Sequence, residues 1–296
     1  MNTRPLSLFF RRGRVAAGLA AALATVVGAG VLMGCSVAEG APGTAGSGQP
    51  TRAADVLLPT AGMEFDYQIG EGYTPPEGVR AVSRDREDEP APGLYNVCYV
   101  NAFQTQPGAL SWWQDTHPGL LLRDDDGELI IDEGWDEVLL DTSTAARRTE
   151  LAEIVGGWID GCAESGFQAV EPDNLDSFER SQGKLTEEHN AAFAGTLAAR
   201  AHSAGLAIGQ KNTTDLLDRH DEIGFDFAVT EECAQFDECG AYADAYDDRV
   251  FAIEYEGEGD VDFGEACSAW GDRISLVLRD LDVLPAGEKG YVRRTC

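Results

Sequence analysis

The sequence contains few basic residues. Lys and Arg together number 22 against 52 Asp and Glu, which gives a formal net charge of -30 at pH 7. A surface this negative repels nucleic acid and anionic lipid, so we expect no nucleic-acid partner. It would attract a cationic ligand, although a general adaptation of the surface to solubility or salt explains the same charge.

Several catalytic and metal-binding motifs are also missing. The four histidines show no HExxH spacing and the cysteines no CxxC spacing, so we expect no metal ion and no cofactor. The serines lack a GxSxG motif, which argues against acyl transfer, and no glycine-rich phosphate loop follows the first predicted strand. The acidic run at 124–128 lacks EF-hand spacing, because Leu122 stands where the first Asp belongs, and a hairpin turn is the better interpretation.

The first 34 residues have the pattern of an export signal. An apolar stretch from Val15 to Met33 follows a basic segment containing Arg4, Arg11, Arg12 and Arg14. The stretch leads into Leu32-Met33-Gly34-Cys35, which resembles the lipobox of bacterial lipoproteins. The resemblance implies cleavage before Cys35, lipid attachment to its thiol, and a position on the extracellular face of the cell membrane. A plain signal peptide and a secreted product are the alternative. Residues 35–60 predict a flexible tether, and residues 61–296 predict one folded domain.

Six cysteines follow Cys35, and an even number in an exported protein indicates disulfides. They are Cys98, Cys162, Cys233, Cys239, Cys267 and Cys296. Six cysteines allow about 15 pairings. Proximity favours Cys233 with Cys239, a bond from Cys267 to Cys296 would tie down the C-terminus, and Cys98 would then pair with Cys162; the other pairings stay open.

The folded part alternates apolar strands with amphipathic helices. One helical stripe runs from Leu151 to Cys162 and is followed by Gly166, a typical helix-ending glycine, while Thr186 is a candidate N-cap of the next helix. The eight strands that we expect are 65–69, 97–101, 138–141, 167–170, 206–209, 225–229, 250–255 and 274–279. Eight strands alternating with helices predict an α/β fold of the (β/α)8 TIM-barrel type.

Polar side chains gather where the predicted strands end, which is the rim that carries active sites in TIM barrels. Asp173 and Glu231 follow the fourth and sixth predicted strands, so their carboxyl groups would face each other across the barrel mouth. Two facing carboxyl groups are what glycoside hydrolysis requires. The sequence therefore indicates Asp173 and Glu231 as a catalytic pair.

Four ordered segments of the chain resemble one known family. GFQAVEPDNLD at 166–176 resembles its GFDGVEPDNVD signature, and FDFAVTEEC at 225–233 resembles its FDFAVNEQC. VCYVNAFQTQP at 97–107 and GLAIGQKN at 205–212 also match. The family is glycoside hydrolase family 114, the endo-α-1,4-polygalactosaminidase family. The resemblance covers nearly all of the chain from Phe65 onwards.

The resemblance implies hydrolysis of α-1,4-linked galactosamine polymers on a TIM barrel, with Asp173 as nucleophile and Glu231 as acid/base. The chain departs from the family pattern at Thr230 and Glu232. Residues expected to bind the polysaccharide are Asp66, Tyr67, Gln68, Asn101, Asp141, Glu171, Asn174, Lys211, Asn212, Glu232, Glu254 and Tyr255. We expect a monomer. The alternatives are hydrolysis of another amino-sugar exopolysaccharide, or a non-catalytic sugar-binding lipoprotein.

Overall fold

The computed structural model describes residues 56–259 and 262–296. The predicted export signal at 1–34, the predicted lipid-attachment residue Cys35 and most of the predicted tether lie outside the described residues. The chain divides into a unit ending at Pro50 and a unit Thr51–Cys296, and only the second contains described residues. Within the described ranges, no helix is both long and apolar enough to cross a membrane.

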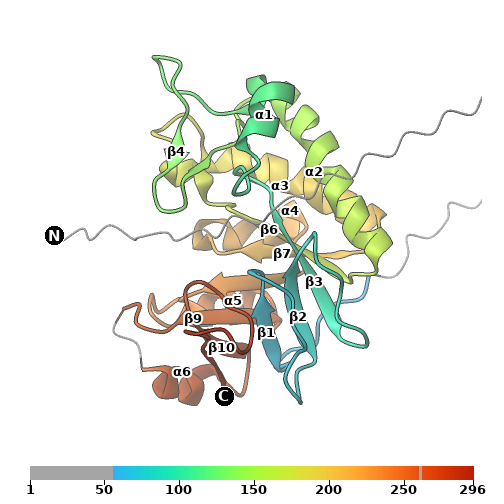
Figure 1. Cartoon of the computed structure of the whole chain (residues 1–296), viewed down its shortest axis with the longest axis vertical. Coiled ribbons are helices and arrows are strands. Elements are labelled where there is room, and N and C mark those ends of the chain that lie inside the picture. Colours follow the sequence, from blue (N-terminus) through green and yellow to red (C-terminus); the bar gives the residue numbers. More distant parts are fainter. Residues whose placement is uncertain (1–55, 260–261) are drawn as a thin grey trace, which may run out of the picture. The chain divides into compact units, whose positions relative to one another are not determined.

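A nine-stranded, nearly closed sheet forms the centre of the second unit (Figure 1). Its parallel strands are, in order around the sheet, β1 (Phe65–Gln68), β2 (Ala81–Asp85), β3 (Tyr95–Asn101), β6 (Ala169–Asp173), β7 (Ala207–Lys211), β8 (Phe227–Glu231), β9 (Val250–Tyr255) and β10 (Ser275–Arg279). The last strand, β11 (Arg293–Thr295), pairs antiparallel with β10. The guanidinium of Arg293 donates to the backbone oxygen of Phe65 on β1, so β11 lies near the seam between β10 and β1. The predicted TIM barrel is confirmed.

The barrel interior is apolar toward the N-terminal ends of its parallel strands. Every parallel strand contributes to one buried cluster, which comprises Phe65, Tyr67, Ala81, Tyr95, Val97, Ala169, Ala207, Phe227, Val229, Phe251, Ile253, Val277 and Val283. Gly209 on β7 makes room in it, because a Cβ at that position would lie 2.8 Å from the ring of Phe227. Side chains alternate between the two faces of a strand. Residues two positions further along these strands therefore also face the barrel axis.

Helices surround the strands. They are α1 (Leu110–Thr116), α2 (Ala145–Ser165), α3 (Glu187–Ser203), α4 (His220–Ile223), α5 (Cys239–Ala245) and α6 (Phe263–Trp270), with 3-10 turns η1 (Pro118–Leu120), η2 (Ser177–Arg180) and η3 (Thr214–Arg219). The expected signals operate: Gly166 ends α2 in the left-handed conformation, and Thr186 caps α3 by accepting a hydrogen bond from the backbone N–H of His189. The buried stripe on α2, including Leu151, Val155 and Ile159, packs into the layer between helices and barrel.

One predicted strand is wrong. The segment Val138–Asp141 lies outside the barrel: Glu137–Val138 forms β5, which pairs antiparallel with β4 (Ile131–Asp132) in a separate hairpin. Isolated antiparallel bridges then join Leu139 to Gln104 and Leu140 to Leu121. The barrel position belongs instead to β2, a short and charged segment that the sequence pattern missed. A short apolar run shows that a segment is extended and buried, but it does not identify the sheet to which the segment belongs.

The connections from β1 to β2 and from β2 to β3 contain no helix. The connections at 69–80 and 86–94 contain only turns and irregular backbone. Both are rich in residues that oppose helix formation, with Pro75 and Pro76 in the first and Pro90 and Pro92 in the second. The regular alternation expected for the barrel therefore begins only after β3.

The structure pairs all six cysteines expected to form disulfides. Cys98 on β3 is joined to Cys162 on α2, which fastens that helix to the barrel. Cys233 is joined to Cys239, and Cys267 on α6 is joined to Cys296 at the end of the chain. These are the pairs that proximity and elimination favoured.

Candidate active site

Toward the C-terminal ends of the parallel strands, the barrel interior is polar. By strand alternation, Ser83, Tyr99, Asn101, Glu171, Asp173, Lys211, Glu231 and Tyr255 follow the inward-facing apolar residues at two-residue spacing. They lie in the C-terminal parts of six neighbouring strands of the sheet, which are β2, β3, β6, β7, β8 and β9. Parallel strands end on the same side, so these side chains meet at one mouth of the barrel.

Lys211 is the centre of this cluster. Its Nζ donates to the hydroxyl of Tyr67 and to Oε1 of Glu171, both at 2.9 Å. The same nitrogen lies 3.3 Å from Oδ1 of Asp173 and 3.3 Å from Oε2 of Glu231. Burial alone would lower the pKa of Lys211, but the three carboxylates outweigh it and hold the pKa well above its ordinary value. One buried ammonium group therefore holds both candidate catalytic acids.

Asp173 is held ready as an anion. The hydroxyl of Tyr99 donates to its Oδ2 at 2.6 Å, in addition to the ion pair with Lys211. Burial opposes ionisation, yet Lys211, Tyr99 and the backbone N–H of Asn174 together lower the pKa of Asp173 below its ordinary value. A carboxylate that stays ionised and keeps part of its side chain accessible has the state expected of a nucleophile.

Glu231 is held by different partners. The amide of Asn212 accepts a hydrogen bond from the Glu231 backbone N–H at 2.8 Å and donates to its Oε2 at 3.2 Å. The hydroxyl of Tyr255 donates to Oε1 at 2.5 Å. Its side chain is 28% exposed, more than the 18% of Asp173, so both carboxyl groups can reach a ligand from the mouth.

The backbone turns sharply at three strand ends beside this pair. Asn174, Asn212 and Glu232 directly follow β6, β7 and β8, and each has a positive φ, of 64°, 46° and 59° respectively. Asparagine tolerates this left-handed conformation better than most residues, whereas glutamate does so at a cost. These turns bring the amide of Asn174 toward Asp173, which precedes it, and the amide of Asn212 toward Glu231 on the neighbouring strand β8.

Two residues expected to bind substrate are buried beneath the mouth. Glu171 is fully buried, and its oxygens accept hydrogen bonds from Tyr67, Ser83 and Lys211. Tyr67 is also fully buried, with its hydroxyl placed between Glu171 and Lys211. Burial raises the pKa of Glu171, against the effect of Lys211. These residues support Lys211 from the interior of the barrel and have no exposed surface with which to contact a ligand.

Asp66 and Gln68 do not reach the mouth either. They alternate with Tyr67 and therefore lie on the opposite face of β1. Asp66 lies 3.5 Å from Arg279 and 3.2 Å from Arg293, and its other oxygen accepts a hydrogen bond from Gln68. All of these groups are largely buried. Strand alternation and burial thus place Asp66 and Gln68 away from the mouth, which argues against our expectation that they bind the polysaccharide.

We predict that Asp66→Asn destabilises the fold without changing catalysis. The substitution leaves the charges of Arg279 and Arg293 less compensated in a buried site, which costs about 3 kcal/mol. The KM of the folded variant should equal that of the wild type. Urea unfolding and steady-state kinetics test this, with the exposed Asp115→Asn as control. A raised KM at unchanged stability would return Asp66 to the binding site.

Asp141 and Glu254 are engaged elsewhere. Asp141 accepts a hydrogen bond from the backbone N–H of Ser143 and pairs with Arg147 at 3.0 Å, at the start of α2. Glu254 accepts a hydrogen bond from the backbone N–H of Ala234 at 3.0 Å. Burial raises its pKa to about 7, which the backbone hydrogen bonds oppose. Neither carboxylate joins the cluster around Lys211.

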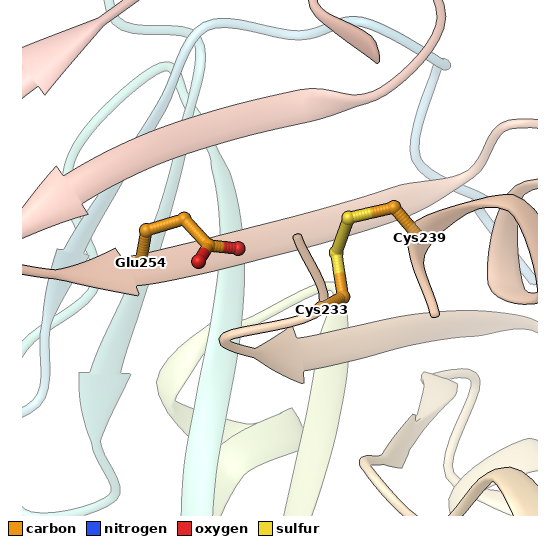
Figure 2. A group of neighbouring side chains, drawn as sticks. All are labelled: Cys233, Cys239 and Glu254. Atoms are coloured by element: carbon orange, nitrogen blue, oxygen red, sulfur yellow. A yellow bond between two sulfur atoms is a disulfide. The ribbon is translucent and has the colours of Figure 1, made fainter. Parts of the chain in front are cut away.

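Glu254 also lies beside two sulfur atoms, as Figure 2 shows. Its carboxylate and the sulfurs of Cys233 and Cys239 lie within 4.8 Å of one another, close enough to hold a metal ion. The two sulfurs are bonded to each other, however. A disulfide provides no thiolate ligand, so this group does not fit a metal centre while the bond is intact.

Sequence reasoning missed several polar residues of the site. Tyr99 and Ser83 lie on inward-facing strand positions, and strand periodicity identifies Tyr99 once Asn101 is placed on the same face. Glu137 directly precedes the segment 138–141 that was misassigned to the barrel. Its Oε2 accepts a hydrogen bond from Asn101 Nδ2 at 2.8 Å, which places its carboxyl group at the mouth. Nothing in the local sequence distinguishes Glu137 from a surface acid.

A parallel barrel whose strand ends present two accessible carboxyl groups around one ammonium group has the architecture of a TIM-barrel glycoside hydrolase. The model of glycoside-hydrolase family GH114 matches residues 46–296. The chain belongs to this family and is a glycoside hydrolase. Among curated proteins, none matches the sequence.

Solved structures share the fold. The crystal structure of Aspergillus fumigatus Ega3 in complex with galactosamine has a TM-score of 0.64 at 21% identity, and the match covers 83% of this chain and 100% of that chain. The glycoside hydrolase domain of PelA from Pseudomonas aeruginosa has a TM-score of 0.51 at 15% identity, covering 76% of this chain and 97% of that domain. At these identities the likeness concerns the fold.

Proposed function

We propose that this glycoside hydrolase cleaves α-1,4-linked galactosamine polymers within the chain, with Asp173 as nucleophile and Glu231 as acid/base. The observation that carries the proposal is the pair of accessible carboxyl groups held by Lys211 at the barrel mouth. Membership of family GH114 and the fold shared with Ega3, which was solved with galactosamine, support the substrate class. Hydrolysis of another amino-sugar exopolysaccharide is the second candidate.

The spacing of the pair favours retention of configuration. Asp173 and Glu231 each place an oxygen 3.3 Å from the same nitrogen, so these two oxygens are separated by no more than twice that distance. That maximum applies only if the three atoms are collinear. Retaining enzymes need about 5 Å between the carboxyl groups, whereas inverting enzymes need about 6.5 to 9.5 Å to admit a water molecule.

In the first step of the proposed mechanism, an Asp173 oxygen attacks the anomeric carbon while Glu231 protonates the departing glycosidic oxygen. The bond between the sugars breaks, and a glycosyl ester on Asp173 forms. In the second step, Glu231 takes a proton from water as that water attacks the anomeric carbon. Asp173 leaves as a carboxylate, and Glu231 regains its proton.

Release of reducing ends from de-N-acetylated galactosaminogalactan by the purified protein tests this function. Endo-acting cleavage should yield a mixture of oligosaccharides early in the reaction. Activity confined to other amino-sugar glycans would favour the second candidate. Binding of the polymer without cleavage, on this or any glycan of the panel, would oppose both and support a sugar-binding protein.

We further propose that the protein is exported and lipid-anchored at Cys35, as a monomer. The support for export and lipid attachment is the sequence pattern alone, since Cys35 lies outside the described residues. Cys35→Ala should prevent lipid attachment and move the protein out of the membrane fraction of a bacterial host. Equal membrane association of the wild type and Cys35→Ala, measured by immunoblotting of fractions, would contradict the anchor.

A further inference from the structure

Glu137 presents an unused carboxylate oxygen at the barrel mouth. The residue is only 6% exposed, and its Oε2 accepts a hydrogen bond from Asn101. Its other oxygen, Oε1, receives no hydrogen bond and no ion pair from any described residue. Unlike the fully buried side-chain atoms that lack a partner, Oε1 keeps solvent access, so it can accept a hydrogen bond from a ligand that donates at the mouth.

This oxygen belongs to the neighbourhood of the candidate nucleophile. Asn101 on β3 pairs in register with Asp173 on β6, and Glu137 contacts Asn101 directly. The Oδ1 of Asn101 accepts a hydrogen bond from Asn174 at 2.9 Å, which completes a chain from Glu137 to the residue beside Asp173. Because the ionised Glu137 only accepts, it fixes the orientation of both amides.

Among the described residues, no positive charge near Glu137 compensates its negative charge by a direct ion pair. Burial is the main cause that raises its pKa to about 7, and the negative charges of Asp173 and Asp132 add to it. The hydrogen bond from Asn101 and the charge of Arg180 oppose them. Arg180 makes its ion pairs with Asp132 and Asp176, however, and Lys211 is bound by the other carboxylates of the mouth.

The other acids expected to attract a cationic sugar already have partners. Asp66 faces two arginines, Asp141 pairs with Arg147, Glu171 pairs with Lys211, and Glu254 accepts backbone hydrogen bonds. Glu232 remains a half-buried acid on the Glu231 side, where it follows the acid/base and not the nucleophile. Glu137 is thus the nearly buried acid with an open oxygen on the Asp173 side.

We propose that Glu137 determines specificity by binding the 2-ammonium group of the sugar whose anomeric carbon Asp173 attacks. This inference rests on the proposed function. In galactosamine the amine is on C2, one bond from the anomeric carbon, so a sugar seated against Asp173 carries its ammonium close to that residue. A carboxylate of Glu137 would bind this cation by a charge-assisted hydrogen bond and would leave a neutral sugar less strongly bound.

The test compares two substrates on the full chain. These are α-1,4-linked galactosamine and galactose oligosaccharides of equal length, which differ in carrying an ammonium or a hydroxyl at C2. We expect the wild type to prefer the galactosamine oligosaccharide in kcat/KM by about 10 to 100-fold. Glu137→Gln retains an acceptor for Asn101 but loses the charge, and it should reduce that preference by about tenfold or more. Glu133→Gln, an exposed change of equal charge on the same hairpin, should leave the preference unchanged.

The outcomes separate the two proposals. If the wild type cleaves the galactosamine oligosaccharide and Glu137→Gln keeps the full preference, Glu137 does not bind the amine, while the proposed function stands. Cleavage of neither substrate by the wild type overturns both. A loss of rate that is equal on the two substrates shows that Glu137 only orients Asn101, and this also overturns the specificity role.

A pH profile of the wild type provides a second test, which does not depend on any variant folding correctly. The ratio of the two kcat/KM values should fall on the acid side, as Glu137 takes up a proton around pH 7, and also on the alkaline side, as the sugar amine loses its charge, because the pairing needs an ionised carboxylate and an ammonium group together. Titration of the catalytic pair cancels in this ratio, since both substrates use it. The charged groups facing Glu137 are Asp173 from β6, Asp132 from β4 and Arg180 from η2. A ratio independent of pH contradicts the proposal.

Discussion

Asp173→Asn is expected to lower kcat on a galactosamine polymer by about 10⁴-fold, with the fold intact. The amide is close in shape to the carboxylate, but it is a poor nucleophile and cannot form the glycosyl ester. Reducing-end release measures the loss, and circular dichroism verifies the fold. Asp218→Asn, an exposed change of the same kind, should retain wild-type activity.

The matching change at Glu231 distinguishes the two roles. Glu231→Gln should lose about 10²- to 10⁴-fold on the polymer, because the departing sugar then receives no proton. An aryl glycoside of a galactosamine oligosaccharide has a leaving group that needs little protonation, so its first step should survive in Glu231→Gln and fail in Asp173→Asn. A glycosyl adduct trapped on Glu231, detected by mass spectrometry, would reverse the assignment.

The positions of the candidate acids were predictable because each lies at the end of a short apolar strand. Asp173 and Glu231 end β6 and β8, and the polar group following an inward-facing apolar strand must emerge at the barrel mouth. Two strand errors did not disturb this. Missing Ala81–Asp85 and including Val138–Asp141 changed the assignment upstream of β6 but not the number of strands that precede it.

The sequence argument placed every polar residue near a strand end at the barrel mouth. Strand alternation separates the residues that face the barrel axis from those that face outwards. Tyr67 faces the barrel axis, so its neighbours Asp66 and Gln68 face outwards, and the same alternation separates Tyr255 from Glu254. Glu137 could not be found in this way. Its place at the mouth depends on a hairpin between β3 and α2 folding back onto the end of β3, a tertiary contact with no local periodic signal.

Lys211→Met is expected to cause the largest loss of stability of any substitution considered. Lys211 lies within ion-pair distance of Glu171, Asp173 and Glu231, and it is itself only 2% exposed. Its removal leaves these carboxylates close together without a cation, a cost of about 3 to 5 kcal/mol at neutral pH. Urea unfolding measures the loss. Lys184→Met, which breaks an exposed pair with Asp125, should cost about 1 kcal/mol or less.

The pH dependence identifies the cause of that loss. In the wild type the lowered pKa of Asp173 contributes stability that is present above its ordinary pKa and disappears as the pH falls through the folded-state value. The raised pKa of Lys211 contributes stability that is lost only as the pH rises through its own folded-state value, so the ion pairs are complete at neutral pH.

Without Lys211, the carboxyl groups should take up protons at higher pH, beginning with Glu171, whose pKa burial already raises. The stability difference between the wild type and Lys211→Met should therefore shrink from neutral pH to about pH 5. Adding Glu171→Gln to Lys211→Met should recover part of the loss at neutral pH, because it removes one uncompensated charge. A difference that stays constant with pH, and a double variant no more stable than Lys211→Met, would mean that packing of the lysine side chain sets its contribution and not its charge.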